Sequence, residues 1–241
     1  MKRTERHHLK DNELAHLASA ARATVESRKN QVTSVVIAIV VILATAIGYT
    51  AWRGRVQARA GSLLAEAMAV QDARVGAPEA PGGPSAGPSY PTEKDKNEAA
   101  LSKLKVVSEQ YPTTEAGIFA RFREGGIQMA LANPREAATA YQQVIDKSGD
   151  GIYGQMARLG LAEAQVRSGE FEKAIETYKA LAERKDGPLP VDGILVQLGR
   201  TYVEAGKPSD AQQVFDRVVQ EFPDSSFIAD ARRELDALKK S

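Results

Sequence analysis

The sequence predicts an all-α protein in which a single N-terminal transmembrane helix is followed by a solenoid of helix pairs. Two observations predict this fold class. First, residues 32–51 carry no charge over a stretch long enough to cross a bilayer as a helix. Second, a pattern of small and apolar residues recurs every 37 residues through the second half of the chain. Stacked helical repeats have periods in this range, because each repeat buries its apolar face against its neighbours.

The predicted transmembrane helix extends over residues 32–52. At roughly 1.5 Å per residue it reaches roughly 30 Å, which is about the thickness of the hydrocarbon core. Tyr49 and Trp52 lie at one end, where amphipathic rings favour the level of the lipid headgroups. A buried core helix and a cleaved signal peptide are the alternatives. A core helix of this length is hydrophobic all round only inside a large protein. Ala44-Thr45-Ala46 resembles a cleavage site, but the charged region before the apolar run is unusually long for a signal peptide. We therefore expect an uncleaved anchor.

Residues 1–31 form a polar segment that we interpret as a cytoplasmic tail. Within about 20 residues of the apolar run, Lys and Arg are balanced on its two sides, so the local charge does not decide the orientation. The tail as a whole carries seven basic residues, which are Lys2, Arg3, Arg6, Lys10, Arg22, Arg28 and Lys29. A short basic tail is retained, whereas a long following domain is translocated largely regardless of its charge. We expect the N-terminus in the cytoplasm.

Two segments of opposite composition follow the apolar run. Residues 53–75 are rich in Ala and lack Pro, so we expect a membrane-proximal helix that continues the anchor. Residues 76–93 contain five prolines interleaved with glycines, which cannot sustain a ladder of backbone hydrogen bonds. We interpret this second segment as a flexible insertion.

The remaining segment, 94–241, contains the repeat. Ala100, Ala137, Ala174 and Ala211 follow one another at intervals of 37 residues (137−100, 174−137 and 211−174). Leu or an aromatic residue stands four positions after each alanine, and Val or Leu stands three positions further on, as in Leu104 and Val107, Tyr141 and Val144, Tyr178 and Leu181, and Phe215 and Val218. Small and apolar residues at this spacing form one buried stripe of a helix.

A second kind of helix is expected before these. Its signature is a Leu followed by a small residue, then Tyr or Gln, then Gly: Leu198-Gly199, Tyr202 and Gly206 in one repeat, and Leu161-Ala162, Gln165 and Gly169 in another. The small residue allows a neighbouring helix to approach closely, and the glycine accepts the left-handed conformation that ends a helix.

These residues resemble the tetratricopeptide repeat family, whose pattern is L-G-x2-Y, then Gly, then A-x3-F and a terminal Pro. The resemblance covers residues 97–238, although the period is 37 rather than about 34. In the first full repeat, Phe122, Gly126 and Met129 fit the first helix, but Asn133-Pro134 leaves the register open by one residue. Residues 224–238 are expected to form a C-terminal capping helix, which an array needs at its end.

Catalysis, metal binding and cofactor binding are not expected. Beyond Trp52 there is no His and no Cys, which removes the usual bases, thiolate nucleophiles and zinc ligands. His7 and His8 form an adjacent pair without clustered carboxylates, which is typical of a solvated tail. Residues 93–241 carry 24 acidic and 21 basic residues without a basic stripe, so we expect no nucleic-acid partner.

The resemblance implies a protein-binding groove, because in tetratricopeptide proteins the first helix of each pair lines the concave face. The positions that it assigns to this groove are Met156, Leu159, Glu163, Arg167, Val196, Arg200 and Glu204. For the apolar members, a place in the interhelical core is the alternative interpretation. The charged members are harder to place in a core, because buried charges need partners.

The combination of a short tail, one anchor and an extracytoplasmic repeat array resembles the ancillary SecYEG translocon subunit family of bacterial inner-membrane proteins. The segment from Glu98 to Leu181, including Tyr111-Pro112, carries this likeness. It implies association with the translocon and with periplasmic chaperones of exported polypeptides. The last repeat, Leu198 to Leu238, is equally similar to repeats of envelope assembly and cell-division proteins such as the Tol-Pal coordinator. A purely structural oligomeric scaffold is a third alternative.

Overall fold

The computed structural model describes residues 29–76, 89–184 and 187–240, and within these ranges it confirms the all-α fold class. The helices are α2 (Lys29–Gln71), α3 (Glu93–Gln110), α4 (Glu115–Ala130), α5 (Pro134–Ser148), α6 (Ile152–Arg167), α7 (Phe171–Ala182), α8 (Val191–Glu204), α9 (Pro208–Glu221) and α10 (Ile228–Leu238). Most of the expected cytoplasmic tail, with His7 and His8, lies outside the described residues, as does most of the expected insertion.

The first of two structural units ends at Arg55, and its described part is the apolar portion of α2. An 18-residue stretch of this helix has a mean hydropathy of 2.3, and none of that stretch is buried within the structure. Large side chains such as Ile42 and Leu43 are 66% and 56% exposed, as is expected of a helix that presents apolar groups to lipid. Within the described part of the chain, α2 is the one helix long and apolar enough to cross a membrane.

The second unit begins at Val56 and contains the end of α2 as well as the helices that follow. Ala67 and Val70 of α2 are buried together with Leu104 and Val107 of α3 and with Ile127 of α4. Glu66 also forms an ion pair of 3.7 Å with Lys103, although both side chains are about half exposed and the pair therefore contributes little. The C-terminal part of α2 thus acts as the first helix of the array.

A short parallel strand pair brings together the two ends of the segment between α2 and α3. It consists of β1 (Arg74–Val75) and β2 (Ser89–Tyr90), in which Arg74 is opposite Ser89. Helix α3 then starts at an N-cap, where the backbone N–H of Asp95 donates to the Thr92 hydroxyl at 3.1 Å. This cap satisfies one of the free N–H groups at the start of the helix.

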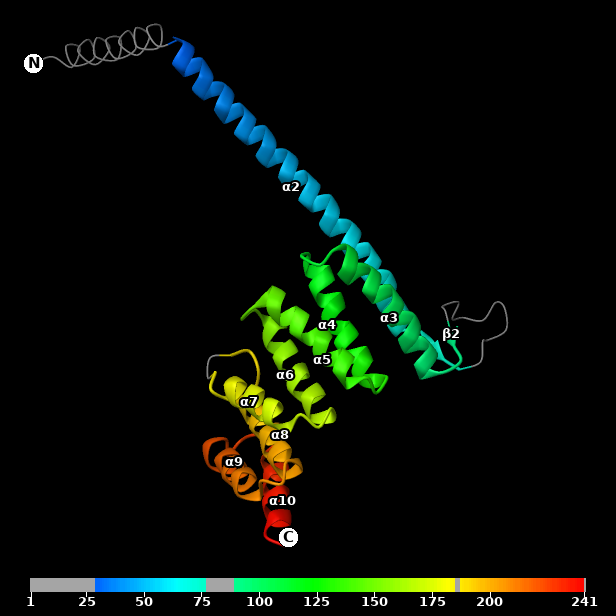
Figure 1. The fold of residues 1–241 in the computed structure, drawn as a ribbon, viewed down its shortest axis with the longest axis vertical. Coiled ribbons are helices and arrows are strands. Elements are labelled where there is room, and N and C mark those ends of the chain that lie inside the picture. The colour runs from blue at the N-terminus through cyan, green and yellow to red at the C-terminus, as the bar shows by residue number, and fades with distance from the viewer. Residues whose placement is uncertain (1–28, 77–88, 185–186, 241) are drawn as a thin grey trace, which may run out of the picture. The chain divides into compact units, whose positions relative to one another are not determined.

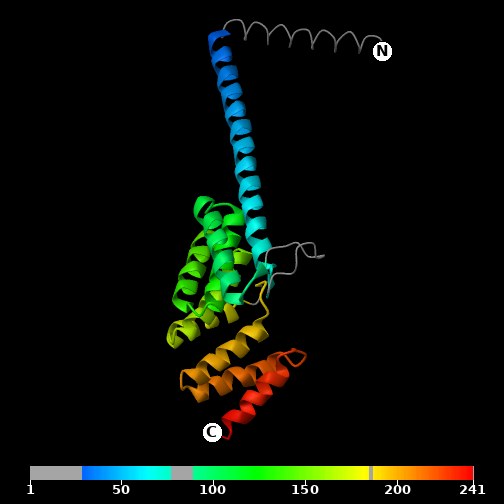
Figure 2. The same cartoon turned by 90° about the vertical axis from the view of Figure 1, so that its right-hand side faces the viewer.

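The array is built from helices that each pack against the next one along the chain, from α3 to α10, and α4 also packs against α6. Figures 1 and 2 show this order from two directions. The four alanines that define the repeat, Ala100, Ala137, Ala174 and Ala211, are all completely buried. The predicted buried stripes of α3, α5, α7 and α9 are therefore confirmed.

The turns inside the helix pairs settle the register that Asn133-Pro134 left open. Ala132, Gly169 and Gly206 occupy the same place in three successive turns, and all three have a positive φ, of 59°, 76° and 71°. In the first of these turns the backbone N–H of Asn133 donates to the carbonyl of Gln128 at 2.8 Å, a bond that the other two turns repeat. The repeat therefore keeps its period of 37, and an alanine stands where the other two turns have glycine.

The same register assigns the close-approach position in α4 to Gly125, one residue before Gly126. A Cβ atom at Gly125 would lie 2.6 Å from the Tyr141 ring, and one at Gly199 would lie 2.5 Å from the Phe215 ring. Phe122, Gly126 and Met129 lie on α4, the first helix of this pair, as expected, and the register that was left open is resolved with Gly125 at the close-approach position. The sequence leaves the register open because Ala132, unlike a glycine, gives no sign of the turn.

Candidate protein-binding groove

One face of the first helix in each pair is defined by three residues that recur at intervals of 37. We call these nine residues the groove stripe: Phe122, Gly126 and Ala130 on α4, Leu159, Glu163 and Arg167 on α6, and Val196, Arg200 and Glu204 on α8. Within one helix they are four residues apart, so they share a face. The stripe contains all of the positions expected from the sequence except Met156, which lies on α6 and is partly buried.

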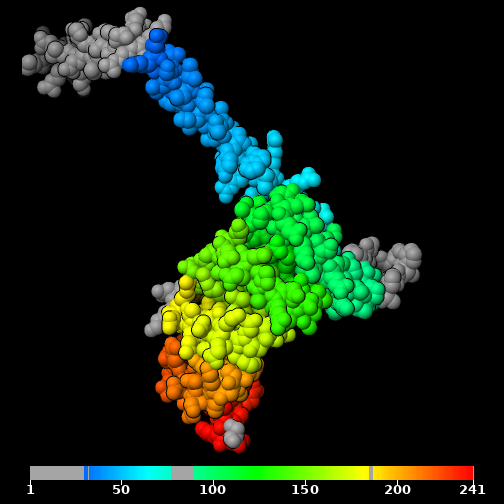
Figure 3. All heavy atoms as spheres, viewed as in Figure 1, coloured from blue at the N-terminus to red at the C-terminus, as the bar shows by residue number. Residues whose placement is uncertain are grey.

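The structure is hollowed at the α4 end of the groove stripe. A pocket of about 370 Å³ is lined by all three stripe residues of α4 and also by Gln71, Asn97, Arg123, Ile127 and Tyr141. Arg123 donates to the Gln71 side-chain oxygen from Nε at 3.1 Å and from Nη2 at 2.9 Å, which ties α4 to the end of α2. In the space-filling view, the helices from α3 to α10 form one continuous packed body (Figure 3).

Aromatic side chains connect this pocket to α6. The rings of Phe119 and Phe122 are 6.5 Å apart, and Phe119 is also 5.7 Å from Tyr153 on α6. Phe122 lies 5.7 Å from Tyr141 on α5. Tilted rings at these distances stabilise one another by about 0.5–1.5 kcal/mol beyond the area they bury. These rings therefore form an aromatic cluster that connects α4, α5 and α6 at this end of the groove stripe.

The middle of the groove stripe is charged and open to solvent. Glu163 and Arg167 on α6 form an ion pair of 3.4 Å in which both side chains are 57% exposed. Burial, followed by the nearby charge of Glu163, raises the pKa of Tyr141 to about 12.

The α8 end of the groove stripe is covered by the capping helix. Val196 is completely buried in the core and does not line a groove, contrary to the expectation from the sequence. Arg200 donates from Nε to Glu234 at 3.0 Å and from Nη2 to Asp230 at 3.3 Å, so its charge is neutralised by α10. Glu204 remains exposed. Among the stripe residues of α8, only Glu204 is thus exposed, and the more open part of the groove stripe lies on α4 and α6.

Sequence reasoning missed the α4 part of this surface, although a signal was present. Subtracting 37 from Leu159, Glu163 and Arg167 gives Phe122, Gly126 and Ala130, which line the pocket. Gln71 carried no such signal, because it precedes the repeat and comes close only through the packing of α2 on α3. Within the described residues, no cluster of His, Cys, Asp and Glu could hold a metal ion.

The chain matches the family described as the tetratricopeptide repeat-like domain over residues 28–239. It belongs to this family. The match includes α2 and the whole array, so the packing of Val56–Gln71 on α3 lies inside the family's domain. None of the curated proteins matches the chain.

Several solved structures share the fold at low sequence identity. A putative kinesin light chain from Podosopora anserina with nearly identical TPR-like repeats has a TM-score of 0.53 and 14% identity, over 60% of this chain and 78% of that chain. MamA has a TM-score of 0.50 and 16% identity, over 63% and 85%. A tetratricopeptide repeat protein from Parabacteroides merdae has 0.50 and 20%, over 61% and 56%. At these identities the likeness shows the fold alone.

Proposed function

We propose that this protein is a membrane-anchored scaffold whose groove, between α4 and α6, holds extended or partly folded polypeptide. A tetratricopeptide-like array is a protein-interaction scaffold. The proposed membrane anchoring of the array is supported by α2, because this one helix contains both the apolar run and the first core helix of the array. We assign the protein no enzymatic role and no cofactor.

We propose further that the anchor lies in the bacterial inner membrane, with the N-terminus in the cytoplasm and the array in the periplasm. There the scaffold would associate with the Sec translocon and assist periplasmic chaperoning of exported proteins. A tethered receptor meets chains that leave a nearby translocon at an effective concentration that can reach roughly millimolar, so weak binding by the groove suffices. The support for this partner is the sequence resemblance together with the accessible apolar and charged groove.

A coordinator of envelope assembly or cell division, of the Tol-Pal type, is the second candidate. It is favoured by the last repeat, Leu198 to Leu238, which the structure gives as two paired helices and a capping helix. The two candidates place different proteins against the same groove.

Site-specific photo-crosslinking distinguishes them. A crosslinker is placed at Glu163 or Arg167 in the groove and, as a control, at Lys173, whose side chain is 66% exposed on α7. The translocon proposal expects adducts with translocon subunits or newly exported chains from the groove positions only. Adducts with cell-division proteins would favour the second candidate, and equal labelling from Lys173 would leave the groove without a role.

Topology is tested separately. A reporter that is active only outside the cytoplasm is fused after Ser241, and we expect activity. A silent reporter on a well-expressed fusion would contradict the orientation and, with it, the role in export.

A further inference from the structure

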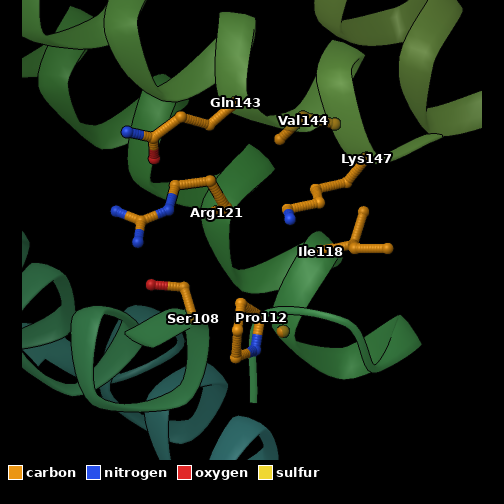
Figure 4. Close-up of a pocket in the computed structure, with 8 residues that line it drawn as sticks. Ser108, Pro112, Ile118, Arg121, Gln143, Val144 and Lys147 are labelled. Carbon is orange, nitrogen blue, oxygen red and sulfur yellow. The ribbon is translucent and has the colours of Figure 1, made fainter. Parts of the chain in front are cut away.

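A second cavity lies away from the groove stripe, between α3, α4 and α5. It has a volume of about 100 Å³, and its lining includes Ser108, Pro112, Ile118, Arg121, Gln143, Val144 and Lys147 (Figure 4). None of these residues belongs to the groove stripe or to the 370 Å³ pocket. The cavity is the size of about one side chain rather than of an extended segment.

Arg121 is held beside this cavity by a buried carboxylate. Glu124 is 2% exposed, and it accepts hydrogen bonds from the hydroxyl of Ser108 and from Nη1 of Arg121, the latter at 2.8 Å. The guanidinium is thereby fixed in position, while its Nε and Nη2 atoms have no hydrogen-bond partner in the described part of the chain. Arg121 itself is 22% exposed, so it can still reach a ligand.

The opposite side of the cavity carries a second, uncompensated cation. Gln143 and Lys147 lie one helical turn apart on α5 and both are exposed. Neither makes a side-chain hydrogen bond or an ion pair within the described residues. Because Glu124 already balances Arg121, the charge of Lys147 remains available to an anion.

Apart from the Ser108 hydroxyl, which donates to Glu124, the rest of the lining is apolar. Pro112 follows α3, Ile118 lies in the first turns of α4, and Val144 is a buried residue of α5. The site therefore combines apolar walls with two cations and an amide. This combination matches a short aliphatic chain that ends in a carboxylate, in which the methylene groups contact the walls and the oxygens face the donors.

We propose that this cavity binds an acidic side chain of a polypeptide partner, with its carboxylate between Arg121, Gln143 and Lys147. The proposal rests on the proposed function as a protein scaffold, but it adds a contact outside the groove. A partner would then be held at two surfaces of the array, which increases avidity without requiring tight binding at either one.

The test uses methyl NMR of the full chain in detergent micelles, with the Ile and Val methyl groups labelled. The probe is N-acetylglutamate N-methylamide, and the matched analogue is the corresponding glutamine compound. We expect the glutamate probe to shift the Ile118 and Val144 signals and the glutamine analogue to leave them in place. Lys147→Gln should weaken binding about fivefold, as expected for one partly exposed charge pair. Lys240→Gln removes the same charge at a distant exposed site and should have no effect.

Four outcomes would overturn the proposal. Equal shifts with both probes would show an apolar cavity without selectivity for charge. Binding that Lys147→Gln leaves unchanged would remove the proposed donor. Inorganic phosphate that binds more tightly than the glutamate probe would indicate a phosphate site. Glutarate that binds as tightly as the amide-capped probe would indicate a small-molecule site. In each case crosslinking from Glu163 tests the groove independently, so the two proposals can fail separately.

Discussion

At each turn inside a helix pair, one residue adopts a left-handed backbone conformation, and in one of three turns that residue is not glycine. In this conformation, steric contacts of the Cβ atom destabilise a residue other than glycine by roughly 1–2 kcal/mol. Glycine avoids this cost but loses more conformational entropy on folding, which offsets about 0.5–1 kcal/mol of its advantage. A Cβ atom at Gly169 or Gly206 would meet nothing within 4 Å. The backbone alone therefore decides which residue is preferred at these positions.

Exchanging the residues at these turns should change stability in opposite directions. We expect Ala132→Gly to stabilise the array by about 0.5–1 kcal/mol, because it relieves a φ of 59°. Gly206→Ala should destabilise it by about 1 kcal/mol at the equivalent position. Thermal unfolding followed by circular dichroism measures both. Two changes of the same sign would contradict the assignment of Ala132 to the glycine position.

Two adjacent glycines of α4 should respond differently to the same substitution. A Cβ atom at Gly125 would overlap the Tyr141 ring, so Gly125→Ala should destabilise the protein by about 1–3 kcal/mol. At Gly126 the nearest atom is the Tyr141 hydroxyl oxygen at 3.8 Å, an ordinary contact. Gly126→Ala should therefore be neutral, or should stabilise the helix by up to about 1 kcal/mol. Thermal unfolding followed by circular dichroism measures both changes in stability. A larger destabilisation from Gly126→Ala than from Gly125→Ala would contradict the register.

The buried Glu124 should make stability depend on pH. Burial raises its pKa above the ordinary value of 4.5, and the Ser108 hydrogen bond and the Arg121 charge offset this only in part. As pH rises past 4.5, the unfolded chain releases this proton while the folded chain still holds it, so folding stability is lost through that window. Glu124→Gln removes this loss. Its stability relative to the unsubstituted protein should be higher at pH 7 than at pH 4.

Denaturant unfolding at the two pH values measures this difference, and Glu176→Gln is the control because Glu176 is exposed on α7. Parallel pH profiles for Glu124→Gln and the unsubstituted protein would show that Glu124 does not titrate differently on folding. A pH effect of equal size in the control would show a general effect of charge.

At the scale of elements, the sequence predicts the second helix of each pair well and the first helix less well. In α3, α5, α7 and α9, one small residue and two apolar residues point into the core at a fixed spacing, so the period of 37 residues is visible in the sequence. The end of α2 buries chiefly Ala60, Ala67 and Val70, which also suit a helix that continues an anchor. The segment between α2 and α3 separates the end of α2 from α3 along the chain, so only the packing in the structure shows that the end of α2 belongs to the array.

The exposure of the residues predicted to line the groove follows only in part from their position in the repeat, for a related reason. The position of a residue within the repeat predicts on which face of its helix it lies. Glu163 and Arg167 are exposed, as a place on the groove face requires. The repeat pattern does not predict which element covers that face at the end of an array. Val196 and Arg200 occupy the expected face, but α10 takes the place that a further repeat would occupy.

The capping helix should be held by its apolar contacts rather than by its ion pairs. Leu235 is 8% exposed in the core shared by α8, α9 and α10, so Leu235→Ala should destabilise the protein by about 2–4 kcal/mol. Arg200 and Glu234 are 35% and 27% exposed, which limits their coupling to about 1 kcal/mol. A double-mutant cycle with Arg200→Met and Glu234→Gln measures the coupling. A coupling larger than the loss from Leu235→Ala would reverse this ranking.

At the scale of the whole molecule, the array begins before the repeat pattern does. The pattern starts near Lys94, whereas the second structural unit starts at Val56. The side chains that cover Leu104 and Val107 include Ala67 and Val70 of α2, so a fragment that starts at residue 94 would expose part of its core to water. The same truncation would remove Gln71, which lines the 370 Å³ pocket and accepts two hydrogen bonds from Arg123.

Fragments 56–241 and 94–241 should therefore differ in stability. Burying a large apolar side chain stabilises by about 1.5–3 kcal/mol, and Val70 with the partly buried Leu63 and Leu64 would be lost, so we expect the longer fragment to be more stable by roughly 3–6 kcal/mol. Urea unfolding followed by circular dichroism measures this, and Arg123→Ala in the longer fragment separates the hydrogen bonds to Gln71 from the apolar contacts. Equal midpoints and slopes for the two fragments would mean that the array is complete without α2. The anchor would then be only a tether, whereas a large difference would show that the membrane-proximal helix is a structural part of the array.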